Sequence, residues 1–497
     1  MTGIISKNSE KKLFWLSISV IVGISYRLYS SRYYPLLDSD DALSVLMTHY
    51  YKLPTDIYCW GQNRGGTLIP FISQLFYKGF GFSEINAVSI SNYLLLIIGF
   101  LGFSSLFKNK FTKILFAFFW FFPPMWFINS LRYPYGVQYC LIGVAVLIID
   151  NLSIEAKQKI TTRQHLLLIL LILIFTSAVW VSDLAAVTVL ILIFTISIFH
   201  LFKNRINFPH KLVMFYFIIG CVFCTGFILY AKNILGLKNP EYLKINSFAE
   251  ASNGIRMTKN TIINLLSFKI NNPFMSVYVY FVILLAVYFP VSFYFKKIIL
   301  SAKAKQWLSF FLMDGLIIFV VILFSRWALI DGYGRRFFIC SYISFGLAIL
   351  ILADYLITIS ERKNVLKTIL FIIVLVGSIS TVYDLKYVNP KNLTSTYKNM
   401  REFETLGECG IIGDYWNSYI VSISNPGMIK AAPHDKNENR NNDIVNEIFK
   451  KPYVYIIKDN WLENYPDTLS QHWRLMYKDG KEFAIGGKSV CRYKIIN

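Results

Sequence analysis

The 497-residue sequence contains little charge. Charged residues make up 16% of it, whereas a typical soluble protein has about 25%, so the composition argues against an ordinary soluble enzyme and against a disordered chain. Acidic residues are the scarcest, since 29 stand against 50 basic residues and only 16 of the 29 precede residue 385. The net charge of +21 could indicate nucleic-acid binding, but 55% of the residues are hydrophobic. The hydrophobic residues form long runs. These runs indicate a membrane protein that contacts membrane lipids and not nucleic acid.

Cysteine is also rare, with seven residues, which argues against a disulfide-stabilised mini-domain. Cys221 and Cys224 have C-x-x-C spacing, but they lie in an apolar stretch without a histidine or a second pair. We therefore interpret them as packing residues and not as metal ligands. Cys409 and Cys491 are the two cysteines of the C-terminal segment, and in an oxidising compartment they could form a disulfide.

Apolar stretches with almost no internal charge recur as far as residue 384. A helix needs about 20 residues to cross a bilayer, and about eleven stretches approach that length. The region 165–202 is too long for one crossing, and we divide it at Ser182-Asp183 because a carboxylate at mid-bilayer depth is costly. The first stretch has no cleavage site and is interpreted as a retained anchor. The sequence thus predicts a polytopic α-helical membrane protein with spans at 13–29, 84–106, 111–129, 133–150, 165–181, 184–202, 211–231, 274–295, 306–330, 335–359 and 365–384.

Basic residues are concentrated in alternate joints between these stretches. Six short joints hold 19 of them, and the intervening short joints hold few. Because positively charged joints remain in the cytoplasm, we expect a cytoplasmic N-terminus and, with an odd number of spans, a C-terminus outside. The basic joint residues are Lys7, Lys11, Lys12, Lys108, Lys110, Lys113, Lys157, Lys159, Arg163, Lys203, Arg205, Lys211, Lys296, Lys297, Lys303, Lys305, Arg362, Lys363 and Lys367.

Three longer segments, 30–83, 232–273 and 385–497, then fall outside the cytoplasm. We assign 1–384 to a transmembrane domain and 385–497 to a small soluble α/β domain. Within the first segment, Gly65–Phe76 is apolar but short and interrupted by proline, so it predicts an interfacial helix and not a span. The expected strands of the soluble domain are Gly410–Gly413, Met428–Ala432, Tyr453–Ile457 and Lys488–Ile496.

Three carboxylates lie within four positions just after the first expected span, in an N-terminal region that is short of acids: Asp38, Asp40 and Asp41. Because close carboxylates repel, one can hold a raised pKa and act as a base while the others bind a cation. A structural interpretation competes with this one, since Asp38, Ser39 or Asp40 could cap a helix over Ala42–Tyr50. The two roles are compatible. Three carboxylates allow a divalent cation without requiring one.

A second polar stretch follows at the expected membrane surface. It contains Asp56, Trp60, Gln62 and Arg64, followed by Gly65-Gly66. Aromatic and amide side chains suit sugar rings and their hydroxyls, and an arginine can hold a phosphate. The alternative is an aromatic belt at the membrane interface with a turn.

Further charged residues lie at or within the expected spans. Arg132, Arg335 and Arg336 map to the outer side, where each can bind a phosphate or anchor its helix at the interface. Of Arg335 and Arg336, we expect one to be functional and the other to anchor its helix at the interface. Asp314 lies inside a span, where a carboxylate is either functional or paired within the helix bundle.

Taken together, these motifs resemble the GT-C superfamily of membrane glycosyltransferases, in particular bacterial relatives of protein O-mannosyltransferase and of lipid A aminoarabinose transferase. The resemblance rests on the order of one span, the Asp38–Asp41 loop, a helix, and the stretch from Trp60 to Leu68. Weaker similarity is found at Arg132, at Gly334–Phe338 and at Trp416. The sequence differs in having three aspartates where the family usually has an acidic pair, which leaves the catalytic one open among Asp38, Asp40 and Asp41.

The resemblance implies a GT-C-like fold in a bacterial inner membrane and an inverting enzyme that takes a sugar from a polyprenyl-phosphate carrier. A carboxylate would act as base at the outer boundary, and Asp56, Trp60, Gln62, Arg64, Arg132, Arg335 and Arg336 would bind substrate. The acceptor could be a surface polysaccharide such as O antigen, a glycolipid or a protein. An O-antigen polymerase or ligase, and a lipid-linked sugar flippase or transporter, are the alternatives. A transporter would be expected to show internal repeats, which the sequence lacks.

Overall fold

The computed structural model describes residues 7–132, 134–152, 161–204, 211–235, 244–295, 300–384 and 394–496. Of the basic joint residues, Lys157, Lys159, Arg205, Lys296 and Lys297 lie outside these ranges. The chain divides into two compact units. We call Met1–Ser25, Leu94–Tyr230 and Lys238–Val388 the helical unit. Tyr26–Tyr93, Ala231–Leu237 and Asn389–Asn497 form the α/β unit, so the first long loop belongs to the same unit as the C-terminal segment.

The helical unit consists of long apolar helices. Most expected spans form one long helix each, and the turn at Ser182-Asp183 separates two of them as expected. The helices that contribute to this unit are α1 (Lys7–Tyr29), α4 (Glu84–Ser104), α5 (Lys110–Phe121), η2 (Met125–Leu131), α6 (Pro134–Asn151), α7 (Thr162–Val181), α8 (Ala185–Asn204), α9 (Lys211–Leu235), α10 (Phe248–Leu266), α11 (Pro273–Phe295), α12 (Ala302–Phe324), α13 (Arg326–Ile330), η4 (Arg335–Phe338), α14 (Ile339–Ile359) and α15 (Lys363–Asp384).

The polytopic helical fold is confirmed, but the count of eleven spans is not. Among the described residues, eight helices are long and apolar enough to cross a membrane, and a bent pair would make a ninth. α1 is not among the eight, and its first turns carry Glu10, Lys11 and Lys12. α8 is apolar over Ala185–Phe199, which is short for a crossing.

Two expected spans were wrong as continuous helices. The stretch 111–129 bends by 91° between α5 and η2, at Pro123-Pro124, where the missing backbone N–H groups and the fixed φ of proline interrupt a helix. The stretch 306–330 breaks at Ser325, which is extended (φ −81°, ψ 119°) and separates α12 from α13.

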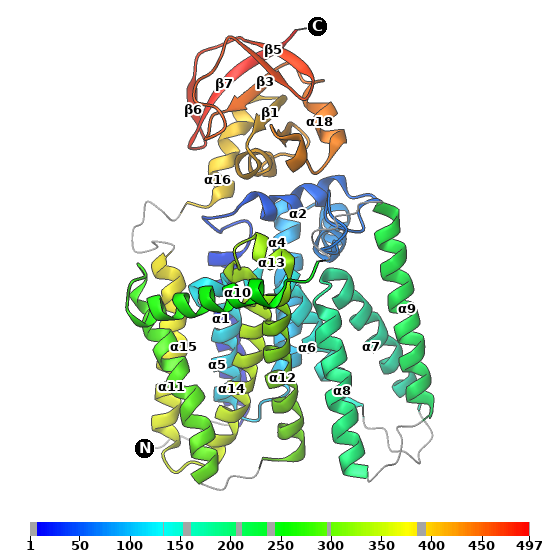
Figure 1. The fold of residues 1–497 in the computed structure, drawn as a ribbon, viewed down its shortest axis with the longest axis vertical. Helices are drawn as coiled ribbons and strands as arrows, with labels where there is room; N and C mark the ends of the chain where they lie inside the picture. The colour runs from blue at the N-terminus through cyan, green and yellow to red at the C-terminus, as the bar shows by residue number, and fades with distance from the viewer. Residues whose placement is uncertain are drawn as a thin grey trace. The chain divides into compact units, whose positions relative to one another are not determined.

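Small residues allow the helices of this unit to pack closely. A Cβ atom added to Gly102 of α4 would lie 2.1 Å from the carbonyl oxygen of Gly143 in α6, and one added to Gly99 would lie 2.6 Å from the Cα of Cys140. Glycine at such positions lets two helix backbones approach each other. Figure 1 shows α12 beside α14 and α11 beside α15, with α10 lying across the ends of α11 and α12.

The α/β unit is built on a seven-stranded mixed sheet. Its strand order is β2-β1-β3-β7-β5-β4, and β6 pairs with β7. β1 is parallel to β2 and β3, and the other pairings are antiparallel. The strands are β1 (Cys409–Gly413), β2 (Ile429–Pro433), β3 (Val454–Ile457), β4 (Thr468–Gln471), β5 (Arg474–Lys478), β6 (Phe483–Ile485) and β7 (Lys488–Ile495).

All four expected strands are confirmed as β1, β2, β3 and β7, whereas β4, β5 and β6 were missed. β1, β2 and β3 are buried along their whole length. β7 lies between β3 and β5 and pairs with both. The missed strands are short and mostly exposed or half-buried. They therefore carry little of the apolar pattern by which a strand is recognised.

The two faces of the sheet bury separate hydrophobic clusters. Cys409 belongs to the cluster that also contains Tyr415, and Cys491 belongs to the other one with Met476. Strand β3 lies between their strands. The possible disulfide is therefore not formed, and both thiols are free and buried.

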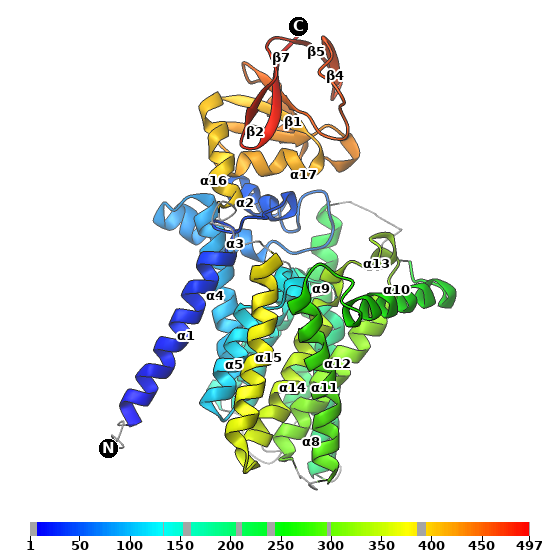
Figure 2. The same cartoon turned by 90° about the vertical axis from the view of Figure 1, so that its left-hand side faces the viewer.

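The long loop at residues 30–83 packs against one face of this sheet. Leu46 of α2 and Trp60 share a hydrophobic cluster with Tyr415, Ile420 and strand residues. Figure 2 shows α17 between the sheet and α2. The remaining helical elements of the unit are α2 (Ser39–Tyr50), α3 (Leu68–Gln74), η1 (Leu75–Gly79), α16 (Thr396–Met400), η6 (Arg401–Leu406), α17 (Tyr415–Ser418), η7 (Tyr419–Ile423), η8 (Lys436–Glu438) and α18 (Asn442–Ile448).

Candidate active site

The three clustered aspartates have different surroundings. Asp38 is the N-cap of α2, and its carboxylate accepts a hydrogen bond from the backbone N–H of Asp41 at 3.0 Å. This contact satisfies an amide that the first helical turn leaves without an intrahelical partner. Asp40 and Asp41 lie in the first turn, where the helix dipole favours negative charge. Asp41 is buried, whereas Asp40 is half-buried.

Asp40 contacts a residue that is remote in sequence. The hydroxyl of Tyr415, at the start of α17, donates a hydrogen bond to Asp40 Oδ1 at 2.6 Å. The guanidinium of Arg440 lies 5.2 Å from the centre of the Tyr415 ring. Burial, followed by the negative charge of Asp40, raises the pKa of Tyr415 well above its usual value, so the phenol stays protonated and acts as the donor.

Asp56 shapes the loop that follows α2. Its two carboxylate oxygens accept hydrogen bonds from the backbone N–H of Lys52 at 2.7 Å and from the indole Nε1 of Trp60 at 3.0 Å. Burial raises the pKa of Asp56, although these two donors oppose the effect. Asp56 and Trp60 are both buried, and together they fix the course of the chain between residues 52 and 60.

Gln62 and Arg64 are presented by a tight loop. Tyr58 pairs with Gly66 in an antiparallel bridge, and the N–H of Cys59 donates to the carbonyl oxygen of Gly65 at 3.0 Å. Gly61 and Gly65 have φ values of +67° and +69°, which only glycine adopts without strain. Both side chains are half-exposed at this loop.

Arg440 reaches the same loop from the C-terminal segment. A Cβ atom on Gly61 would lie 3.1 Å from Arg440 Cδ, so the two segments are in contact. The negative charge of Asp40 and the positive charges of Arg440 and Arg64 also act on Cys59, whose pKa is raised to about 11 mainly by burial. The structure thus brings the predicted Asp40 and Arg64 into one neighbourhood, together with Tyr415 and Arg440.

Sequence reasoning missed Tyr415 and Arg440. Tyr415 lies beside Trp416, a position of weak similarity to the family. Nothing in that stretch indicates a contact with a residue 375 positions earlier. Arg440 lies in a polar loop without any motif. Among the described residues, no group of three or more His, Cys, Asp or Glu side chains converges to hold a metal ion.

The other three predicted arginines belong to the helical unit. Arg132 follows the end of η2, and Arg335 and Arg336 begin η4. These two short helices pack together. The side chain of Arg132 contacts Asn129. The guanidinium of Arg335 lies 4.5 Å from the centre of the Trp126 ring, and that of Arg336 pairs with Asp331. The structure therefore brings the segments of all three arginines together.

Asp314 has partners inside the helix bundle. It is fully buried in α12, and it accepts hydrogen bonds from the Tyr139 hydroxyl of α6 and the Ser344 hydroxyl of α14. Such a cluster links three helices through groups that lipid could not satisfy. Of the two roles expected for Asp314, this geometry provides the pairing role.

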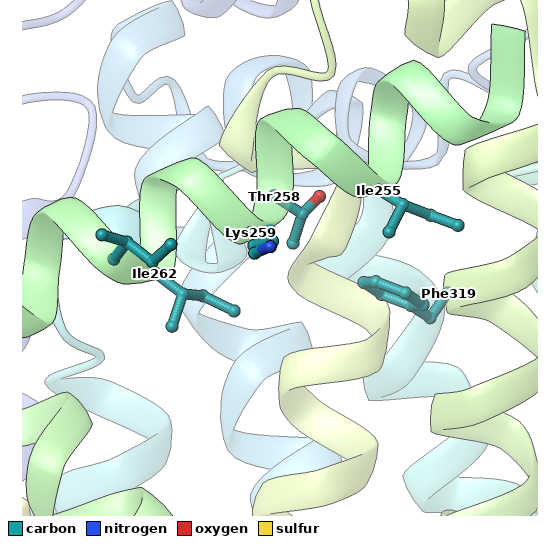
Figure 3. A pocket seen from close by; sticks show the side chains of 6 residues that line it. Ile255, Thr258, Lys259, Ile262 and Phe319 are labelled. Carbon is teal, nitrogen blue, oxygen red and sulfur yellow. The ribbon is translucent and has the colours of Figure 1, made fainter.

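A groove of about 300 Å³ lies between α10 and α12. Figure 3 shows Ile255, Thr258, Lys259 and Ile262 of α10 on one side of it and Phe319 of α12 on the other. Its lining is apolar apart from Thr258 and Lys259, and it contains none of the site residues predicted from the sequence.

Comparisons with known proteins were made by sequence and by structure. No protein-family model and no curated protein matches the sequence. Among solved structures, ArnT from Cupriavidus metallidurans bound to undecaprenyl phosphate matches with a TM-score of 0.59 and 10% identity over 98% of both chains. The Archaeoglobus fulgidus oligosaccharyltransferase in complex with zinc and sulfate has a TM-score of 0.49 and 12% identity, over 89% of this chain and 68% of that one. The chain therefore has the fold of ArnT, which confirms the polytopic helical fold with a C-terminal sheet that the sequence predicts.

Proposed function

We propose that the protein is an integral membrane glycosyltransferase that moves a sugar from a polyprenyl-phosphate donor to an acceptor outside the cytoplasm. The observation that carries the proposal is the setting of Asp40, a half-buried carboxylate in the first turn of α2 that Tyr415 holds by a hydrogen bond, with Arg64 and Arg440 nearby. The shared fold supports it, because the matching ArnT structure contains undecaprenyl phosphate.

In the proposed reaction Asp40 is the general base. Its carboxylate takes the proton from the acceptor hydroxyl, and the acceptor oxygen forms a bond to the anomeric carbon of the donor sugar. The bond between that carbon and the phosphate oxygen breaks at the same time, and the polyprenyl phosphate leaves with the electron pair. Attack from the face opposite to the phosphate inverts the anomeric centre. Base catalysis and stabilisation of the departing anion are the two contributions that such a transfer requires.

The remaining predicted residues are assigned by their chemistry. Arg64 is proposed to bind the donor phosphate. Within the helical unit, Arg132, Arg335 and Arg336 are proposed as anion-binding residues. Gln62 is proposed to bind sugar hydroxyls. Asp56 and Trp60 shape the loop that presents these groups, since their polar atoms are bonded to each other and to the chain.

We propose a bacterial inner membrane as the location, with the N-terminus in the cytoplasm and both the acidic loop and the C-terminal segment outside. The proposed acceptor is a surface polysaccharide such as O antigen, with a glycolipid or a protein as the other acceptor classes. A carboxylate base needs no metal for this chemistry, although a divalent cation at the donor phosphate is compatible with it.

The test is the variant Asp40→Asn, expressed in a strain from which the gene has been deleted. The amide cannot accept a proton at neutral pH, so we expect sugar transfer to fall by at least about 100-fold, the usual contribution of a positioned base. Mass analysis of the envelope glycan measures the transfer, and immunoblotting of membranes measures expression.

Asp467→Asn is the matched control, because it makes the same change at an exposed aspartate of the same unit. It should restore the glycan fully. Full glycan modification by Asp40→Asn would contradict the assignment of the base.

A further inference from the structure

We infer that Tyr415 and Arg440, both from the C-terminal segment, are positioning residues for Asp40, so that this segment completes the active site. The inference rests on the proposed function and extends it, because neither residue was assigned from the sequence.

The position of Tyr415 is fixed by its surroundings. It follows strand β1 directly and begins α17, whose N-cap Asp414 accepts a hydrogen bond from the N–H of Asn417 at 2.7 Å. The side chain is 6% exposed, and its ring makes edge-on contacts with Trp416 and Tyr419. The hydroxyl therefore reaches Asp40 from a side chain that is held by the core of the sheet.

Arg440 joins three parts of this neighbourhood. Its backbone N–H donates to the hydroxyl of Tyr419 at 2.8 Å, and its guanidinium lies over the Tyr415 ring. Its Cδ would lie 3.1 Å from a Cβ atom added to Gly61, in the loop that presents Gln62 and Arg64. A cation over an aromatic face is attracted by the ring. Arg440 thus holds the tyrosine and the loop together beside Asp40.

The consequence for Asp40 concerns its orientation. A hydrogen bond from the phenol of Tyr415 holds the carboxylate in one direction. A general base must lie within hydrogen-bond reach of the proton that it takes. Removing the phenol hydroxyl should therefore lower the rate constant of transfer.

A purely structural role is the competing explanation, in which Tyr415 only docks the C-terminal segment against α2. That role predicts lower stability for a Tyr415 variant but an unchanged kcat of the folded protein. The kcat of the folded variant therefore distinguishes the two explanations.

The experiment compares Tyr415→Phe with the wild type as full-length proteins in lipid nanodiscs. The probe is a lipid extract from the deletion strain, which contains the unused donor, together with the envelope fraction of that strain as acceptor. We expect kcat to fall by roughly tenfold while KM stays near the wild-type value, because the lost hydrogen bond orients the base and does not bind substrate.

Tyr493→Phe is the matched control. Tyr493 is a buried tyrosine of the same sheet, and its hydroxyl donates to the carbonyl oxygen of Pro466 at 2.7 Å. This variant also loses one hydrogen bond, but we expect its kcat to be that of the wild type. If Tyr415→Phe does not purify as a folded protein, Arg440→Gln replaces it and should also lower kcat.

The outcomes separate the two proposals. A wild-type kcat for Tyr415→Phe, or for Arg440→Gln in its place, would overturn the positioning role while an inactive Asp40→Asn still supports the base. Full transfer by Asp40→Asn would instead contradict the assignment of Asp40 as the base, whatever the result for the Tyr415 variants.

Discussion

At the scale of single residues, the three aspartates of the acidic cluster have different surroundings. The spacing of Asp38, Asp40 and Asp41 predicts both a helix cap and a possible base. Only the structure separates these roles, because the contact that singles out Asp40 comes from Tyr415, 375 positions away. Hydrogen bonds between distant segments depend on how the whole unit folds, and no local pattern encodes them.

The two roles lead to opposite expectations for aspartate-to-asparagine changes. Asparagine caps a helix as well as aspartate does, so Asp38→Asn should keep both the bond to the N–H of Asp41 and near-normal transfer. Asp38→Ala removes the acceptor and should lower the free energy of unfolding by about 1 kcal/mol. A thermal melt of the purified variants and the glycan assay measure the two effects. Loss of transfer in a stable Asp38→Asn protein would show that Asp38, and not only Asp40, takes part in the chemistry.

At the scale of elements, apolar patterning predicted where helices form but not where they bend. Pro123-Pro124 divides α5 from η2, and Ser325 divides α12 from α13. Both breaks fall within stretches whose composition fits a single span. They position Arg132 and the loop before Arg335 on short segments and not on long helices.

The sheet explains why its cysteines do not pair. Successive side chains of a strand point to opposite faces, and Cys409 and Cys491 belong to different clusters. We expect the protein, denatured without reductant, to titrate all seven thiols with Ellman's reagent. A count of five would indicate a disulfide and would contradict the arrangement of β1, β3 and β7.

At the scale of the whole molecule, the sequence predicted the class of fold but not the grouping of its parts. The alternation of basic joints and apolar stretches led to a helical membrane protein with a C-terminal α/β segment, and the shared fold with ArnT confirms that class. The association of the first loop with the C-terminal segment in one compact unit was not visible, because it depends on buried contacts such as those of Trp60 and Tyr415.

This grouping requires the acidic loop and the C-terminal segment to lie on the same side of the membrane. The distribution of basic residues predicts that both lie outside the cytoplasm. Alkaline phosphatase fused after residue 497 should therefore be active, because this enzyme folds only in an oxidising compartment. A fusion made after Lys367, in a joint expected to be cytoplasmic, is the control and should be inactive. The reverse pattern would contradict the proposed orientation.

The central claim is that the chain transfers a sugar from a polyprenyl-phosphate donor, and mass analysis of the cell envelope tests it most directly. Cells without the gene should lack one sugar residue on an envelope glycan and should accumulate the polyprenyl-phosphate-linked form of that sugar. The wild-type gene should reverse both changes. Identical glycans and identical donor-lipid levels with and without the gene would contradict the claim.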